Sequence, residues 1–89
     1  MGRNAKDLLE RMKRSKAGWK RVDLDAVYKG YGFVLEGRAK HDKVYHPEFP
    51  QLLTYLPRHR KLAESYVAEL ILKIAQLEEL QAKEEKKND

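Results

Sequence analysis

The last third of the chain carries an apolar pattern with the period of an α-helix. Hydrophobic residues recur there at intervals of three or four positions, at Leu62, Ala63, Tyr66, Val67, Leu70, Ile71, Ile74 and Leu77. This spacing places the side chains on one side of a helix, which is predicted to run from Arg60 to about Lys83. This apolar stripe is interpreted as part of the protein's own hydrophobic core. The alternative is that it packs on a helix of a partner protein.

A different pattern, typical of short β-strands, occupies the middle of the chain. Three β-prone runs cover residues 33–36, 40–45 and 51–56, and they are separated or closed by Gly37, Pro47, Pro50 and Pro57. Their connections are too short for parallel crossovers, which need about a dozen residues, so the strands are expected to be antiparallel. Because side chains alternate along a strand, His41 should face away from the core if Val44 faces toward it.

Two shorter helices are expected before the strands. A basic helix is predicted over about residues 4–15, where apolar residues recur at helical spacing. A second helix is predicted over about residues 24–31, with Asp23 as its N-cap. Val22 and Val27 stand at the two positions of a hydrophobic staple, which would fix the entry of the chain into this helix.

The order of these elements predicts an α+β protein. Its core is expected to have αβββα order, with two helices on one face of a three-stranded antiparallel sheet and an extra basic helix at the N-terminus. A chain of 89 residues is too short for two independent cores. We therefore divide it into a basic helical leader (1–21), a single αβββα domain (22–82) and a polar tail that frays (83–89). The second face of such a sheet is open to a ligand.

Charge is distributed unevenly along the chain, whose formal net charge is +5. Residues 1–21 carry a net charge of +6, residues 22–60 carry +1 and residues 61–89 carry −2. The positive excess favours a polyanionic partner, with nucleic acid ahead of a membrane surface. The alternative is that the basic leader is only a solvated surface.

Several structural and functional features are excluded or disfavoured because the sequence lacks the residues or segments that they need. It has no cysteine, which removes disulfides, Cys-ligated metals and thiol nucleophiles and fits an intracellular protein. It has no apolar run long enough to span a membrane and no secretory signal at its start, so a soluble cytoplasmic protein is expected. His41 and His46 lie on opposite faces of one strand, so a zinc site with His59 is disfavoured and no metal or other cofactor is expected.

Two groups of basic residues stand out in the central part of the chain. The first lies around the turn before the second strand and comprises Arg38, Lys40, His41 and Lys43. The second lies at the predicted start of the long helix and comprises Arg58, His59, Arg60 and Lys61. Cations are unfavourable at a helix N-terminus, whereas a bound phosphate would satisfy both the helix dipole and these side chains. The alternative is that the long side chains simply extend into solvent.

A histidine among phosphate-binding cations is the combination that metal-free RNA cleavage needs. The 2′-hydroxyl loses a proton as it attacks the adjacent phosphorus, and the leaving 5′-oxygen gains one. Histidine side chains in general titrate near neutral pH and can do either, while Lys and Arg stabilise charge on the phosphoryl oxygens. His41 is therefore the candidate catalytic residue, and an ordinary exposed histidine in a basic patch is the alternative.

Several short segments of the sequence match a known pattern. They are Tyr31-Gly32-Phe33 before the first strand, Gly37-Arg38-Ala39-Lys40-His41 at the turn, Val44-Tyr45 and His46-Pro47 along and after the second strand, and Leu56-Pro57-Arg58-His59 after the third. Through these steps, the stretch 23–80 resembles the HicA-like mRNA interferase toxins of bacterial toxin–antitoxin pairs.

This resemblance implies a fold, an activity and a partner. The fold would be similar to a double-stranded RNA-binding domain, and the activity would be metal-independent endonucleolytic cleavage of mRNA. His41 is carried over as the catalytic residue, and a cognate HicB-type antitoxin is expected to cover the site. The expected RNA-binding residues are Arg38, Lys40, Lys43, Arg58, His59 and Arg60. A non-catalytic RNA-binding module on the same scaffold is the alternative.

Overall fold

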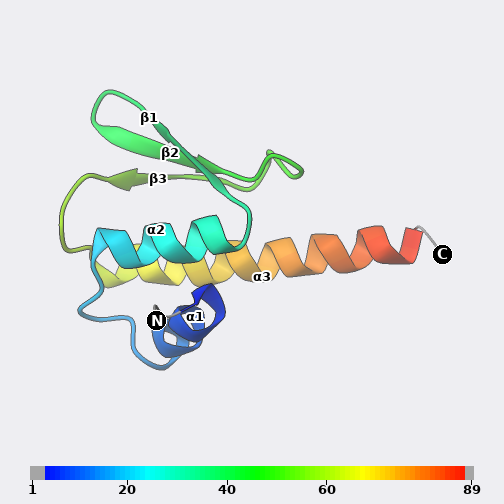
Figure 1. Ribbon diagram of the computed structural model, residues 1–89, viewed down its shortest axis with the longest axis horizontal. Coiled ribbons are helices and arrows are strands. Elements are labelled where there is room, and N and C mark those ends of the chain that lie inside the picture. The colour runs from blue at the N-terminus through cyan, green and yellow to red at the C-terminus, as the bar shows by residue number, and fades with distance from the viewer. Residues whose placement is uncertain (1–3, 88–89) are drawn as a thin grey trace.

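Two short helices, three strands and a long helix follow one another in the computed structural model, which describes residues 4–87 (Figure 1). The helices are α1 (Ala5–Arg14), α2 (Arg21–Gly30) and α3 (Glu64–Lys87), and the strands are β1 (Val34–Gly37), β2 (His41–Tyr45) and β3 (Leu53–Pro57). The predicted α+β fold, with an extra helix before the αβββα part, is confirmed.

The strands form one antiparallel sheet in the order β1-β2-β3, with β2 in the centre. Both α2 and α3 lie on the same side of this sheet, and α1 packs against them on the side away from the strands (Figure 1). No element between residues 4 and 87 covers the other face of the sheet. The predicted arrangement of two helices on one face is therefore confirmed.

One hydrophobic core lies between the sheet and the helices. The stripe of α3 contributes the buried residues Val67, Leu70, Ile74 and Leu77, so it packs inside this protein as predicted. Leu8, Leu9 and Met12 of α1 belong to the same cluster, which joins the basic leader to the body of the fold. The indole of Trp19 packs against this cluster as well, and its Nε1 donates a hydrogen bond to the Ser15 carbonyl oxygen at 2.8 Å.

The start of α2 differs from the prediction. The helix begins at Arg21 rather than Leu24, and Asp23 lies in its first turn. The Asp23 carboxylate accepts a hydrogen bond from the Lys20 N–H at 3.0 Å, so it supports the helix start from inside the helix instead of capping it. Val22 is 67% exposed, so the predicted hydrophobic staple is wrong.

The start of α3 also differs, because the chain before it pairs with the chain before α2. The Arg21 N–H donates to the Arg60 carbonyl oxygen at 2.9 Å, and the Leu62 N–H donates to the Trp19 carbonyl oxygen at 3.2 Å. These bonds hold residues 60–62 in an extended conformation, so the helix begins at Glu64 rather than Arg60.

The far end of α3 is longer than the sequence pattern indicated. The helix continues to Lys87 and its last turns extend beyond the rest of the molecule, so the part of the predicted frayed tail up to that residue is helical (Figure 1). Glu, Lys, Gln and Ala are strong helix formers, and Lys83 pairs with Glu79 one turn earlier at 3.6 Å. Residues 88–89 of the predicted tail lie outside the described residues.

The strands are displaced by one or two residues from the predicted runs, most clearly at β3. It begins at Leu53 instead of Gln51, because residues 46–52 form a tight loop. In this loop the His46 N–H donates to the Leu52 carbonyl oxygen at 3.3 Å. The His46 ring is 3% exposed and meets Phe33 edge-on, with 5.1 Å between the ring centroids. The buried His46 side chain therefore holds this loop against the hydrophobic core.

The two N-terminal helices cross at a point of close approach. A β-carbon added to Gly30, the last residue of α2, would overlap the β-carbon of Ala5, the first residue of α1. The glycine thus leaves the space that α1 occupies. Gly32 has a different role, because its φ of 92° is the left-handed conformation in which the chain leaves α2.

Substitution of Gly30 tests this crossing. Gly30→Ala is expected to lower the free energy of unfolding by about 1–3 kcal/mol, because overlap with Ala5 outweighs the better helix propensity of alanine. Ala5→Gly removes the opposing methyl group, so the double variant should be more stable than Gly30→Ala alone. Urea unfolding followed by circular dichroism measures both. Equal stability of the single Gly30→Ala and double variants would contradict this account of the crossing.

Candidate nucleic-acid interface

The uncovered face of the sheet carries side chains from alternate positions of all three strands. Glu36 of β1 lies opposite Lys43 of β2, and Lys43 lies opposite Tyr55 of β3. Directly opposed residues of antiparallel strands point to the same face. We call this surface the open sheet face, and its residues are Val34, Glu36, His41, Lys43, Tyr45, Leu53, Tyr55 and Pro57. It is partly apolar, because Val34, Leu53 and Tyr55 are 38%, 37% and 49% exposed, respectively.

His41 is the first residue of β2 and is exposed on the open sheet face. The turn before it is closed by the Arg38 N–H, which donates to the His41 carbonyl oxygen at 3.0 Å. Val44 on the opposite face of the strand is buried, so the predicted orientation of both residues is confirmed. The hairpin backbone fixes the position of His41 and leaves its imidazole accessible.

The cations predicted around His41 are engaged elsewhere or exposed. Arg38 forms an ion pair with Glu36 at 2.5 Å, and Lys40 is exposed in the turn. Lys43 extends over the Tyr45 ring, with its Nζ 5.2 Å from the ring centroid, and therefore leans away from His41. Within residues 4–87, no hydrogen bond joins any of these cations to the imidazole.

Arg58, from the second predicted group, lies at the same end of the sheet as His41. Its Nε donates to the Asp42 carboxylate at 3.0 Å, and its Nη2 donates to the Arg38 carbonyl oxygen at 2.5 Å. This side chain therefore joins the end of β3 to the turn between β1 and β2. Of the residues predicted from the sequence, Arg38, His41 and Arg58 are brought together here.

Arg21 completes this end of the sheet, and its role was not predictable from the sequence. Its Nη2 donates to the Asp42 carboxylate at 2.6 Å, its Nη1 to the Pro57 carbonyl oxygen at 3.0 Å and its Nε to the Asp25 carboxylate at 2.6 Å. One guanidinium thus connects α2 with β2 and β3. Hydrogen bonds from Arg21 and Arg58 lower the pKa of Asp42 below its ordinary value.

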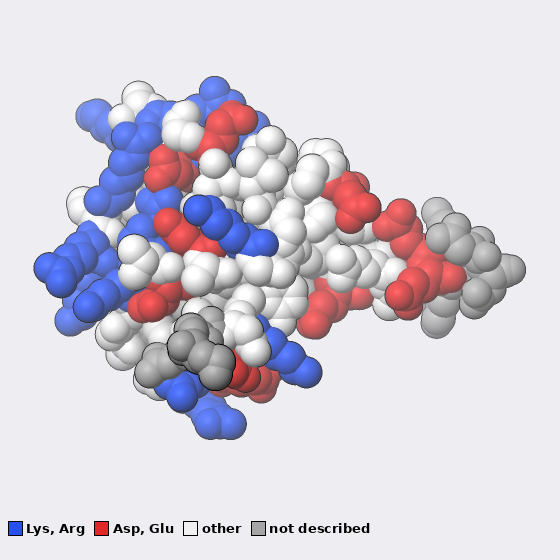
Figure 2. Space-filling model, in the orientation of Figure 1, with Lys and Arg blue, Asp and Glu red and all other residues white. Residues whose placement is uncertain are grey.

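The remaining cations of the second group lie on an extended segment. Because α3 begins only at Glu64, the predicted placement of these cations at the start of the long helix is wrong. Lys61 instead pairs with Lys20 in an isolated antiparallel bridge. We call this segment and its bridge partner the basic ledge, which comprises Lys20, His59, Arg60 and Lys61. Figure 2 shows Lys and Arg side chains crowded over the end of the molecule that contains this ledge and the turn between β1 and β2.

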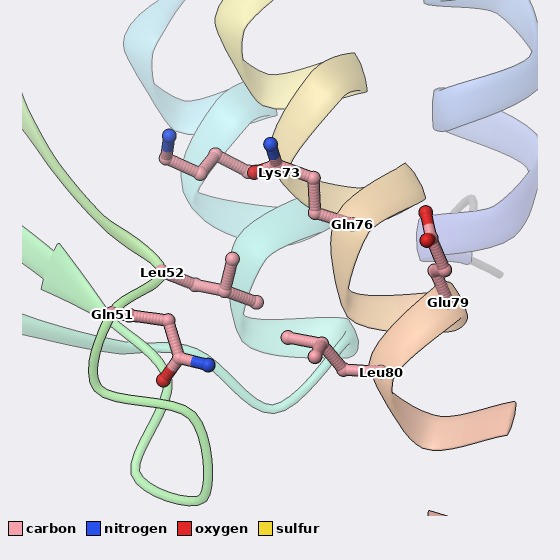
Figure 3. Close-up of a pocket in the computed structure, with 6 residues that line it drawn as sticks. All are labelled: Gln51, Leu52, Lys73, Gln76, Glu79 and Leu80. Atoms are coloured by element: carbon pink, nitrogen blue, oxygen red, sulfur yellow. The ribbon is translucent and has the colours of Figure 1, made fainter. Parts of the chain in front are cut away.

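A pocket of about 410 Å³ lies at the other end of the sheet. Its lining comes from the loop between β2 and β3 and from one side of α3, and comprises Gln51, Leu52, Lys73, Gln76, Glu79 and Leu80 (Figure 3). This loop follows the last residue of β2, whereas His41 is the first. None of the residues predicted for the functional site lines the pocket.

The described part of the chain contains neither a metal-binding cluster nor a membrane-spanning helix. Residues 4–87 contain no group of three His, Cys, Asp or Glu side chains placed to hold a metal ion. Within the same residues, no helix is both long enough and apolar enough to cross a membrane. His41, His46 and His59 are accordingly not gathered at one place, since His46 is buried on the covered side of the sheet.

Comparison with known proteins gives no relative for this chain. No family model matches it, and no curated protein or solved structure has significant similarity to it. The resemblance to HicA-like toxins therefore rests on the short sequence steps between Tyr31 and His59.

Because the pKa of Asp42 is lowered in the folded protein, its contribution to stability should depend on pH. Asp42→Asn is expected to lower the free energy of unfolding at pH 7 by roughly 1–3 kcal/mol, because hydrogen bonds to two charged guanidinium groups are weakened. A lowered folded-state pKa means that the carboxylate stabilises the fold above the ordinary aspartate pKa of about 4 and loses this effect as the pH falls through the folded-state value. The difference between wild type and variant should therefore shrink below about pH 4.

Urea unfolding at a series of pH values from neutral to strongly acid measures this difference. Glu48→Gln, at an exposed position in the loop between β2 and β3, is the matched control and should change stability by less than about 0.5 kcal/mol. A loss in Asp42→Asn that stays constant over the acid range would contradict the assigned role of the carboxylate.

Proposed function

We propose that the protein is a metal-independent endoribonuclease toxin that cleaves mRNA, with His41 as its catalytic residue. The position of His41 carries this proposal: the imidazole is exposed on the open sheet face, at the end where Lys and Arg gather (Figure 2). An acid–base group in this position is accessible to an extended polyanion, which needs no deep pocket.

The reaction is an internal transfer at one phosphodiester. The His41 imidazole takes the proton of the 2′-hydroxyl as the 2′-oxygen attacks the adjacent phosphorus. The bond between phosphorus and the 5′-oxygen breaks, and the leaving oxygen gains a proton from the imidazolium or from water in exchange with it. The products are a 2′,3′-cyclic phosphate and a 5′-hydroxyl, and the atoms balance without a co-reactant.

The cations near His41 hold the RNA backbone. Lys40, His59 and Arg60 are exposed and available to phosphate oxygens. Arg38 and Arg58 are paired with Glu36 and Asp42, but each guanidinium has five N–H donors and retains some for a phosphate. Lys43 supplies charge from the open sheet face itself. Cleavage and binding therefore share one end of the molecule.

The partner and the compartment follow from the resemblance of residues 23–80 to HicA-like toxins. A HicB-type antitoxin covers the open sheet face and neutralises the toxin until it is released. Both proteins act in the cytoplasm, where mRNA is the substrate.

A non-catalytic RNA-binding module is the second candidate, and one observation favours it. Within the described residues, the His41 imidazole has no hydrogen-bond partner that would orient it as a base. In that function, the basic ledge and the cations of the turn supply salt-dependent affinity for phosphates, and no proton is transferred.

Cleavage of labelled single-stranded RNA tests the proposal. The purified wild-type protein is expected to generate 2′,3′-cyclic phosphate ends, and a metal chelator should leave the rate unchanged. His41→Ala should lower the rate by about 10²- to 10⁴-fold, because general acid–base catalysis contributes that much. Expressed without an antitoxin, the wild type should arrest growth and His41→Ala should not.

Gln51→Ala is the control, because this residue lines the pocket at the opposite end of the sheet from His41. It should cleave RNA at the wild-type rate, and circular dichroism should give the same folded spectrum for all three proteins. Cleavage by His41→Ala at the wild-type rate would exclude the proposed catalyst. Salt-dependent RNA binding by the wild type without any product would instead support the RNA-binding module.

A further inference from the structure

Tyr55 is the most exposed aromatic side chain of the open sheet face. It lies in the middle of β3 and is 49% exposed, although a tyrosine buries much apolar area when it packs. The aromatic contacts within residues 4–87 join Tyr28, Phe33, His46 and Phe49 on the covered side, so Tyr55 has no aromatic partner in this part of the chain. About half of this residue's surface is therefore accessible to a ligand.

The strand register places this ring beside His41. Pro57 lies opposite His41, and Tyr55 lies opposite Lys43, so Tyr55 and His41 are diagonal neighbours on the same face. Diagonal pairs in an antiparallel sheet are about 7–8 Å apart, which is within reach of an aromatic side chain. A ligand that contacts the imidazole therefore has the phenol ring next to it.

Lys43, which lies opposite Tyr55, adds a positive charge to this surface. It lies between His41 and Tyr45 along β2, and its Nζ extends over Tyr45. The arrangement offers a flat aromatic surface with an ammonium group on one side and an imidazole on the other. A flat aromatic ring beside an ammonium group matches a nucleotide, which has an aromatic base and an anionic phosphate.

We propose that Tyr55 is a stacking platform for a base of single-stranded RNA next to the phosphodiester at His41. This inference rests on the proposed function, and it specifies which form of RNA the site takes. In a duplex the bases are paired and stacked on one another, so their faces are not available to a side chain. An unpaired base can stack on the ring in any sequence, because every base has an aromatic face.

Binding experiments in the His41→Ala background separate stacking from cleavage. A fluorescent single-stranded RNA should bind Tyr55→Ala about 5- to 150-fold more weakly than the His41→Ala parent, the range expected for one base–aromatic stack. Tyr55→Phe retains the ring and should bind like the parent. Leu72→Ala, which truncates an exposed side chain of α3 outside this face, should change affinity by less than about 3-fold. A duplex of the same sequence should bind Tyr55→Ala and the parent equally.

Kinetics with His41 intact complete the test. Tyr55→Ala should raise KM for single-stranded RNA, and Tyr55→Phe should restore the wild-type value. Unchanged affinity and KM in Tyr55→Ala would overturn the stacking platform while leaving the ribonuclease proposal intact. Conversely, Tyr55-dependent binding without any cleavage by the wild type would support the platform and exclude the ribonuclease. Loss of self-association in Tyr55→Ala with unchanged RNA affinity would overturn the proposal by identifying the face as a contact between protein copies.

Discussion

The contacts of the Arg21 guanidinium hold together the end of the molecule that carries the candidate site. Its side chain is only 12% exposed, and a charge held this close to the core needs partners to offset the loss of water. Asp25 and Asp42 supply those partners from α2 and β2, and the Pro57 carbonyl adds one from β3. Because Asp42 follows His41 directly, the contact that fixes the helix to the sheet also fixes the strand from which the imidazole projects.

The elements that depend on local pattern were predictable, and their boundaries were not. The apolar stripe of α3 and the alternation of His41 and Val44 in β2 follow from periodicity, which the sequence displays directly. The starts of α2 and α3 depend on the bridge between Lys20 and Lys61, which joins segments far apart in the chain. Propensity and capping patterns contain no information on such pairing.

The candidate site was also only partly predictable from the sequence. The two basic groups were visible in the sequence, but the pairing of Arg58 with Asp42 required the arrangement of β2 and β3. In the sequence, Arg21 cannot be distinguished from the other cations of the leader. Its partner Asp42 lies in β2, far along the chain, so the ion pair becomes visible only in the fold. Tyr55 lies within the predicted strand run 51–56, and its alternation with the buried Leu56 is the signal that its ring faces away from the core.

The extension of α3 beyond the body gives the molecule a permanent electric dipole along its length. Residues 78–89, at this end of the chain, carry five acids and three Lys, a net charge of −2, whereas Lys and Arg crowd the opposite end of the molecule (Figure 2). Near a polyanion, such a dipole experiences a torque that turns the basic end forward before any contact forms. The helix can thus orient diffusional encounters without contacting the ligand, and the effect weakens as added salt shortens the range of the field.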